Sequence, residues 1–172
     1  GYIRAQAGGE IIGGYDDAVR CAVRHMNVNP HERNVLVAHQ FVCASGSMPL
    51  RSDSEMIFVG GTELVSAESV GGFDYVALGH LHQAQRVGGE FVRYAGAPLK
   101  YALGESASLK SFAVVDLYSK GETRVQLVPI RPSIDLRMER GKLEELLDRP
   151  ASDRDGDFIE VRLTDEQPVF DA

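Results

Sequence analysis

The fold of this chain follows from one stretch, Phe73-Asp74-Tyr75-Val76-Ala77-Leu78-Gly79-His80-Leu81-His82. Its apolar residues predict a short strand that ends at a glycine and is followed by two histidines one residue apart. The earlier segment 34–40 has the same design, because its apolar run ends at His39. Ligands of open α/β sheets gather at the carboxyl ends of the strands. We therefore expect an α/β fold that places His39, His80 and His82 at one edge of a sheet.

These three histidines predict part of a metal centre. Gly79 lets the backbone turn closely under a ligand, and His80 and His82 can each reach a different ion. Two metal ions about 4 Å apart are the usual means of hydrolysing phosphate esters, because they bind the phosphoryl oxygens and convert a bound water to hydroxide. Mixed sets of histidine, carboxylate and asparagine suit manganese, iron or zinc. We expect His25 and His31, which follow no strand, to be surface residues.

The composition suits a globular protein of ordinary size, with 172 residues of which 44% are hydrophobic. No apolar run approaches the ~20 residues that would span a bilayer, and no leader pattern is present at the start. Two cysteines are too few for a disulfide scaffold, which favours a reducing, cytoplasmic location. The first residue is Gly1, so we expect the chain to be part of something longer.

The charge is unevenly distributed along the chain. The net charge of −7 argues mildly against binding of nucleic acid by charge alone. Residues 93–142 hold nine Lys/Arg against five Asp/Glu, whereas residues 143–172 hold three against ten. The stretch after the histidine motif is therefore basic and the tail acidic. An ordinary solvated surface explains this distribution equally well.

The apolar periodicity and the turn residues predict the order of the elements. Hairpins are expected around Gly88-Gly89 and Lys120-Gly121. We expect helices at 15–28, 62–70 (capped by Thr62) and 142–147, a loop at 43–54, a charged linker at 150–157, and strands at 34–42 (buried), 56–59, 75–78, 85–87, 91–94, 111–117, 123–130 and 158–163.

Several stretches together carry a resemblance to a known family. They are the Gly-His-x-His motif at 79–82 within 73–82, segment 33–42, Asp53-Ser54-Glu55, segment 93–101 and Leu163-Thr164-Asp165-Glu166. The motif alone resembles the calcineurin-like metallophosphoesterases. The whole set, in order across residues 33–166, is similar to the SbcD family of bacterial exonuclease subunits.

The resemblance implies an α/β fold, part of a four-layered metallophosphoesterase sandwich that is followed by the start of a small α+β capping domain. Residues 1–132 would form the C-terminal part of the nuclease domain, and residues 133–172 a linker and the start of the capping domain.

The resemblance also implies roles for the histidines. His39 and His80 match ligands of one manganese ion, and His82 matches a ligand of a second. The family's Asp-x-His motif, bridging Asp, metal-binding Asn and catalytic His have no counterparts in this sequence, so no catalytic residue is assigned. The missing ligands are expected in an N-terminal segment, and we expect the isolated chain to be inactive and to bind manganese weakly.

The family function implied is metal-dependent cleavage of DNA in repair and recombination, as an exonuclease on duplex ends and an endonuclease on hairpins and single strands. The implied partners are DNA and the SbcC-type coiled-coil ATPase, with a homodimer inside a heterotetramer. Two alternatives stay open: a generic phosphodiesterase or phosphatase of the same superfamily, and a non-catalytic interaction module.

A few further residues are candidates for contacts near the site. Lys100 and Tyr101 follow a Gly-x-Pro turn and are candidates for substrate binding, because a lysine there could meet a DNA phosphate. A structural turn with a solvated Lys100 is equally compatible. Gln83 and Gln85 either hydrogen-bond near the metals or end the motif loop. We interpret Cys43 as a packed thiol and not a ligand.

Overall fold

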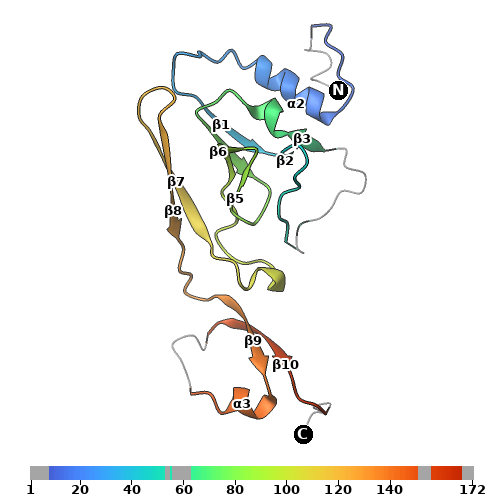
Figure 1. Ribbon diagram of the computed structural model, residues 1–172, viewed down its shortest axis with the longest axis vertical. Helices are drawn as coiled ribbons and strands as arrows, with labels where there is room; N and C mark the ends of the chain where they lie inside the picture. Colours follow the sequence, from blue (N-terminus) through green and yellow to red (C-terminus); the bar gives the residue numbers. More distant parts are fainter. Residues whose placement is uncertain (1–7, 53–54, 56–62, 151–155, 168–172) are drawn as a thin grey trace.

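The computed structural model describes residues 8–52, 55, 63–150 and 156–167 (Figure 1). The predicted strand 56–59, the Thr62 cap and two residues of the Asp53-Ser54-Glu55 stretch lie outside these ranges. The fold class is mixed α/β, as predicted. The elements in chain order are α2 (Tyr15–Arg24), β1 (Val35–His39), β2 (Phe41–Cys43), β3 (Leu64–Ser66), the 3₁₀ helix η1 (Ala67–Val70), β4 (Tyr75–Gly79), β5 (Gln85–Val87), β6 (Gly89–Tyr94), the 3₁₀ helix η2 (Leu103–Glu105), β7 (Ser111–Leu117), β8 (Thr123–Pro129), β9 (Leu136–Gly141), α3 (Leu143–Leu147) and β10 (Phe158–Leu163).

A four-stranded sheet with the order β1-β4-β6-β5 positions the histidine motif. Strands β1, β4 and β6 are parallel, and β5 is antiparallel to β6. The register pairs His39 with Gly79 at the carboxyl ends of β1 and β4. Because parallel strands end at the same edge, the two predicted strands deliver their histidines to one place. This part of the prediction is confirmed.

The core lies between this sheet and the elements that connect its strands. Nine buried residues form one cluster, and Val19 and Val23 of α2 pack against it. Asp17 stabilises the start of α2, where its Oδ2 accepts hydrogen bonds from the backbone N–H groups of Gly13 and Gly14. The helix ends at Arg24, four residues earlier than predicted, since Asn27 adopts a positive φ of 49° that no helix continues. The clustered residues are Leu36, Val42, Val65, Val70, Val76, Leu78, Leu81, Val87 and Tyr94.

Two predicted elements differ from the structure. The predicted helix 62–70 is wrong in its first half: Leu64–Ser66 forms β3, which pairs in parallel with β2, and only Ala67–Val70 is helical. Val65 is buried in the core as a strand residue, so tertiary pairing overrides the local propensity.

The predicted strand 34–42 is divided at Gln40 into β1 and β2, which belong to different sheets. Its near-continuous apolar run predicted burial on both faces. Instead Val37 is 78% exposed, while Leu36 is buried. One face of β1 is therefore open to solvent in this structure.

Both predicted hairpins are present, and the second is tied to the sheet by a buried carboxylate. Strands β7 and β8 pair over their full length, and their turn contains Lys120 and Gly121. Asp74 accepts hydrogen bonds from Lys120 Nζ (2.7 Å), Gly121 N (2.9 Å) and Asn34 N (2.7 Å). The Lys120 ammonium, followed by the two backbone donors, holds the pKa of Asp74 well below its usual range. Asp74 thus joins the starts of β1 and β4 to the hairpin turn.

The C-terminal elements form a separate two-stranded parallel sheet, drawn at the bottom of Figure 1. Strand β9 is paired with β10, and α3 lies between them in sequence, as a short βαβ unit. Strand β10 and α3 were predicted, whereas β9 was missed. The domain boundary at 132/133 stays a prediction. Within the described ranges, no helix is long and apolar enough to cross a membrane.

Candidate metal centre

His39 and His80 lie in contact at the carboxyl edge of the sheet. Their ring centroids are 5.4 Å apart, and the rings meet edge to face at 84°. Two imidazoles that bind one ion through metal–nitrogen bonds of about 2.1 Å place their centroids about 5 Å apart. The observed separation therefore fits a pair of ligands for one metal ion. Phe41 borders the pair, with its ring 5.9 Å from that of His80.

Gly79 makes room for this pair. A Cβ at position 79 would lie 2.8 Å from Nδ1 of His39, so any other residue would displace the ring. His80, the next residue, has φ of 103°, a backbone conformation that non-glycine residues rarely adopt. Such strain is common at functional sites, where the surrounding structure maintains it. The glycine therefore accommodates a neighbouring histidine, in addition to the close ligand approach predicted from the sequence.

Tyr94 supports the segment that leaves the site after His39. Its hydroxyl accepts a hydrogen bond from Val42 N (2.6 Å) and lies 2.9 Å from Gln40 O and 3.2 Å from Val42 O. The side chain is 1% exposed, and burial raises the pKa of Tyr94 to about 12. The hydroxyl therefore stays protonated and donates to one of the two carbonyls.

His82 occupies a different environment from the His39–His80 pair. Its Nδ1 lies 3.2 Å from Oε1 of Glu105, and its backbone N–H donates to the Glu55 carboxylate. The other oxygen of Glu105 accepts from Lys110 Nζ at 2.6 Å. The structure therefore groups His39 with His80 and holds His82 separately, which is the division between two ions that the resemblance implies.

Glu105 is ionised despite its burial at 4% exposure. Burial raises the pKa of this carboxyl, but hydrogen bonds from Lys110, Ser52 and His82 and the charge of Lys110 outweigh it and lower the pKa to about 2. Neither Glu105 nor Lys110 was predicted to be near the site. Glu105 lies in a single 3₁₀ turn, η2, and no spacing in the sequence links it to His82.

Lys100 and Tyr101 play unequal parts. Lys100 Nζ donates to Ser106 O (2.8 Å), Leu136 O (2.9 Å) and Asp135 Oδ2 (3.0 Å), which uses all three of its protons. Its side chain is 9% exposed. In this structure it is therefore neither a solvated lysine nor a free phosphate ligand, and it ties the turn to β9. Tyr101 is 62% exposed, and its ring lies 5.3 Å from that of His82.

The remaining candidates have structural contacts. Gln85 forms two hydrogen bonds with the backbone of Leu50, which favours the interpretation that it ends the motif loop. Cys43 is partly buried, and burial raises the pKa of its thiol, as for a packed cysteine. His25 and His31 are exposed, as predicted.

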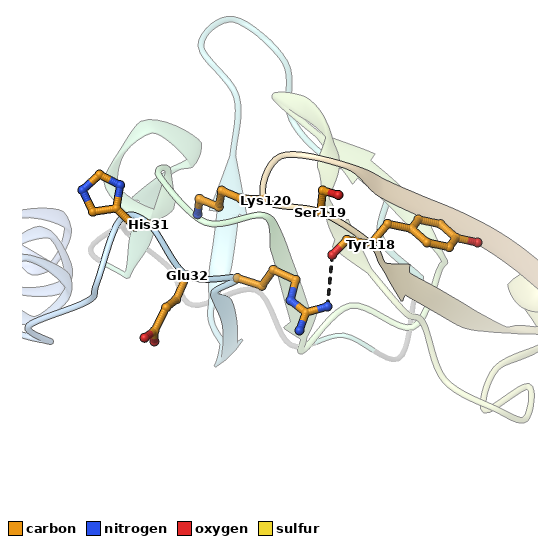
Figure 2. A pocket seen from close by; sticks show the side chains of 6 residues that line it. His31, Glu32, Tyr118, Ser119 and Lys120 are labelled. Carbon is orange, nitrogen blue, oxygen red and sulfur yellow. Dashed lines mark hydrogen bonds between the residues drawn. The ribbon is translucent and has the colours of Figure 1, made fainter.

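An open pocket lies away from the histidine motif, between the start of β1 and the β7–β8 turn (Figure 2). Its cationic side chains are engaged within the protein. Arg33 donates to the carbonyls of Leu117 and Tyr118, and Lys120 pairs with Asp74. The pocket therefore stabilises the hairpin turn.

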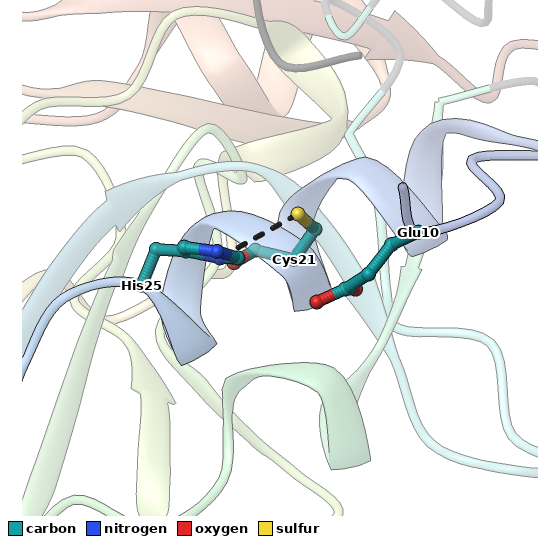
Figure 3. Close-up of side chains that lie close together, drawn as sticks. All are labelled: Glu10, Cys21 and His25. Carbon is teal, nitrogen blue, oxygen red and sulfur yellow. Dashed lines mark hydrogen bonds between the residues drawn. The ribbon is translucent and has the colours of Figure 1, made fainter. Parts of the chain in front are cut away.

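A second group of potential ligands is formed by Glu10, Cys21 and His25 (Figure 3). Among the described residues, it is the one set of three whose ligand atoms lie within 4.8 Å of one another. Two of its members already have partners. Nδ1 of His25 lies 2.8 Å from the carbonyl of Cys21, at the end of α2, and Glu10 is paired with Arg24 at 2.5 Å. These contacts account for the group as a helix terminus.

Curated proteins similar to this chain share one name, which describes each as the SbcD component of the nuclease SbcCD. The chain is 32% identical to the Bacillus subtilis protein over 161 residues, which is 88% of this chain and 41% of that protein. It is 26% identical to the Staphylococcus epidermidis protein over 161 residues, with 91% of this chain and 42% of that protein covered. For the Staphylococcus saprophyticus protein the identity is 28% over 127 residues, with 73% and 32% covered. The chain thus spans about two fifths of the length of these relatives or less. No protein-family model matches the chain.

Proposed function

The chain belongs to the SbcD family of nuclease subunits, and from this premise we propose that its histidines serve the metal-dependent hydrolysis of DNA phosphodiester bonds. The observation that carries the proposal is the meeting of His39 and His80 at the carboxyl edge of β1 and β4. When bound there, two divalent metals, with manganese expected, would activate a water and neutralise the phosphoryl oxygens.

The chain's own residues divide the work. His39 and His80 would hold one ion, with Gly79 providing the room and Tyr94 supporting the segment after His39. His82 would hold the second ion. The exposed ring of Tyr101 beside His82 is suited to stack against a nucleotide base, since aromatic rings bind unpaired bases in this way.

The isolated chain is proposed to be inactive. The sequence contains neither Asp-x-His nor Gly-Asn-His-Asp, and imidazoles alone seldom bridge two metals. We propose that the bridging carboxylate and the catalytic acid come from residues outside these 172. The relatives are named as one component of the nuclease SbcCD, which supports a partner. For this partner we propose an SbcC-type coiled-coil ATPase, together with DNA and a homodimer inside a heterotetramer.

The metal role is tested by titrating Mn²⁺ into the 172-residue chain and measuring free Mn²⁺ by electron paramagnetic resonance. Weak binding is expected, and His39→Gln and His80→Gln should each reduce it. The exposed His31 offers a matched control, because His31→Gln removes an imidazole without touching the site. Equal affinity in all four proteins would refute the proposed ligands.

The nuclease role is tested in a longer protein that contains these residues. Mn²⁺-dependent degradation of linear duplex DNA is expected, with His80→Gln as the inactive variant. Hydrolysis of a chromogenic phosphodiester without any action on DNA would favour a general phosphodiesterase instead. For the isolated chain no degradation is expected, and Mn²⁺-dependent loss of DNA would refute its proposed inactivity.

A further inference from the structure

We propose that Glu105 and Lys110 form a positioning pair that holds His82 as the Nδ1–H tautomer, with its Nε2 lone pair free for a ligand. The inference rests on the proposed function, because it assigns an orienting device to the proposed metal ligand His82. Neither residue touches the reacting atoms in this role, so both are positioning residues.

The hydrogen bond to the ring determines which nitrogen carries the proton. Lys110 Nζ contacts Glu105 Oε2 at 2.6 Å, and this ion pair is almost entirely enclosed by protein. An ionised carboxylate can only accept hydrogen bonds. The contact of 3.2 Å between Glu105 Oε1 and His82 Nδ1 therefore requires the proton on Nδ1. In the neutral ring, Nε2 is then unprotonated, which is the form that binds a metal ion. Carboxylates commonly orient metal-binding histidines in this way without contacting the metal themselves.

The same segment also holds the backbone of His82. Its carbonyl accepts hydrogen bonds from Lys110 Nζ (3.0 Å) and from Ala97 N (3.0 Å). Gly96 has φ of 80°, and a Cβ there would approach the His82 carbonyl to 3.0 Å. Residues 96–110 therefore hold His82 at both its ring and its backbone.

The cost of burying the pair supports a positional role. Taking a carboxylate and an ammonium out of water carries a desolvation penalty that their attraction often fails to offset. A pair of apolar residues would stabilise this part of the core as well or better. Glu105 and Lys110 have contacts that apolar residues would lack, since each one hydrogen-bonds to His82. Orientation of His82 therefore explains what stability alone does not.

The proposal is tested by the tautomer of His82 in the metal-free 172-residue chain. Long-range ¹H–¹⁵N correlation spectra distinguish protonated from unprotonated ring nitrogens, and a chain of 18.8 kDa is suited to them. The spectra are recorded at mildly alkaline pH, where unperturbed imidazoles are neutral. The signal that disappears in His82→Gln is assigned to His82, and the exposed His31 provides an internal reference.

We expect His82 to be the Nδ1–H tautomer in the wild-type chain and to lose this preference in Glu105→Gln. Because Glu105→Gln leaves Lys110 buried without its counter-ion, it can fail to fold. The double variant Glu105→Gln/Lys110→Met removes both charges and serves as the second test. An Nε2–H tautomer in the wild type would overturn the proposal. So would an Nδ1–H tautomer that persists in a folded variant without Glu105.

A Mn²⁺ titration of the same samples separates this inference from the proposed function. Loss of a residue that orients a metal-binding histidine lowers metal affinity by roughly 10- to 100-fold, so broadening of the His82 signals by Mn²⁺ should require more metal in the variant. Broadening at equal Mn²⁺ concentration in both proteins would overturn the positioning role. Absence of Mn²⁺ binding to the wild type would refute the proposed metal ligands, while the tautomer result would still decide the role of Glu105.

Discussion

Replacement of Tyr94 by phenylalanine should destabilise the chain by removing one buried hydroxyl. This hydroxyl accepts from Val42 N at 2.6 Å and donates to the carbonyl of Gln40 or Val42. Tyr94 and Val42 are both fully buried, so water cannot replace the lost contacts. The change therefore isolates the link between β6 and the chain segment that follows His39.

The magnitude follows from what the change leaves unpaired. Phenylalanine retains the ring, so the apolar contacts remain and the cavity contribution is small. A buried polar group left without its partner costs about 1–3 kcal/mol. We therefore expect Tyr94→Phe to lower the free energy of unfolding by about 1–3 kcal/mol. In a chain of this length, that loss corresponds to a melting temperature lower by roughly 2–12 °C.

The assay is equilibrium unfolding in urea, followed by circular dichroism, with Tyr118→Phe as the matched control. Tyr118 loses the same hydroxyl but is half exposed. Changes at such surface positions usually stay within about 0.5 kcal/mol. The slope of the unfolding curve should be unchanged in both variants. If Tyr94→Phe costs no more than Tyr118→Phe, the supporting role of Tyr94 is refuted.

Three further predictions concern the site. The lowered pKa of Glu105 contributes stability at neutral pH that is lost as the pH falls from about 4.5 to about 2, by at most about 3 kcal/mol; urea unfolding across this window should show a shallower pH dependence in Glu105→Gln, and an equal dependence would contradict the ion pair. Gly79→Ala should displace the His39 ring, since its Cβ would lie 2.8 Å from Nδ1; the ring signals of His39 should shift, and unchanged signals would show that the ring has room. Tyr101→Ala should weaken binding of single-stranded DNA by about 1–3 kcal/mol if the ring stacks on a base, whereas Tyr101→Phe should retain it in fluorescence anisotropy; equal losses in both variants would exclude stacking.

Local sequence patterns predicted the elements whose stability depends on short-range pairing. The strand 111–117 was predicted with the bounds that β7 has, and both hairpins follow their glycine turns. The alternation of apolar and polar residues at 136–141 was available for β9 but was not used, because a strand this short resembles a loop. The predicted helix 62–70 failed because Leu64–Ser66 pairs with β2, a contact between residues more than twenty positions apart.

The site was predictable to a similar degree. Each of His39, His80 and His82 follows an apolar run, and a parallel sheet brings the ends of such runs to one edge. Their environments were not predictable, because each depends on residues remote in sequence. Glu105 comes to His82 from a loop 23 residues away, and Lys100 is withdrawn from solvent by Asp135 and Leu136 on β9.

Short apolar periods, turn residues and motif order were enough to predict the fold class, the hairpins, the three histidines and the family. Tertiary packing was needed to learn which histidines share a ligand position, which ring nitrogen of His82 faces a carboxylate, and which lysine is withdrawn from a substrate. The physical reason is that a buried charge or hydrogen bond is set by the partner that burial places beside it. That partner is chosen by the packing of the whole chain, and no local pattern encodes it.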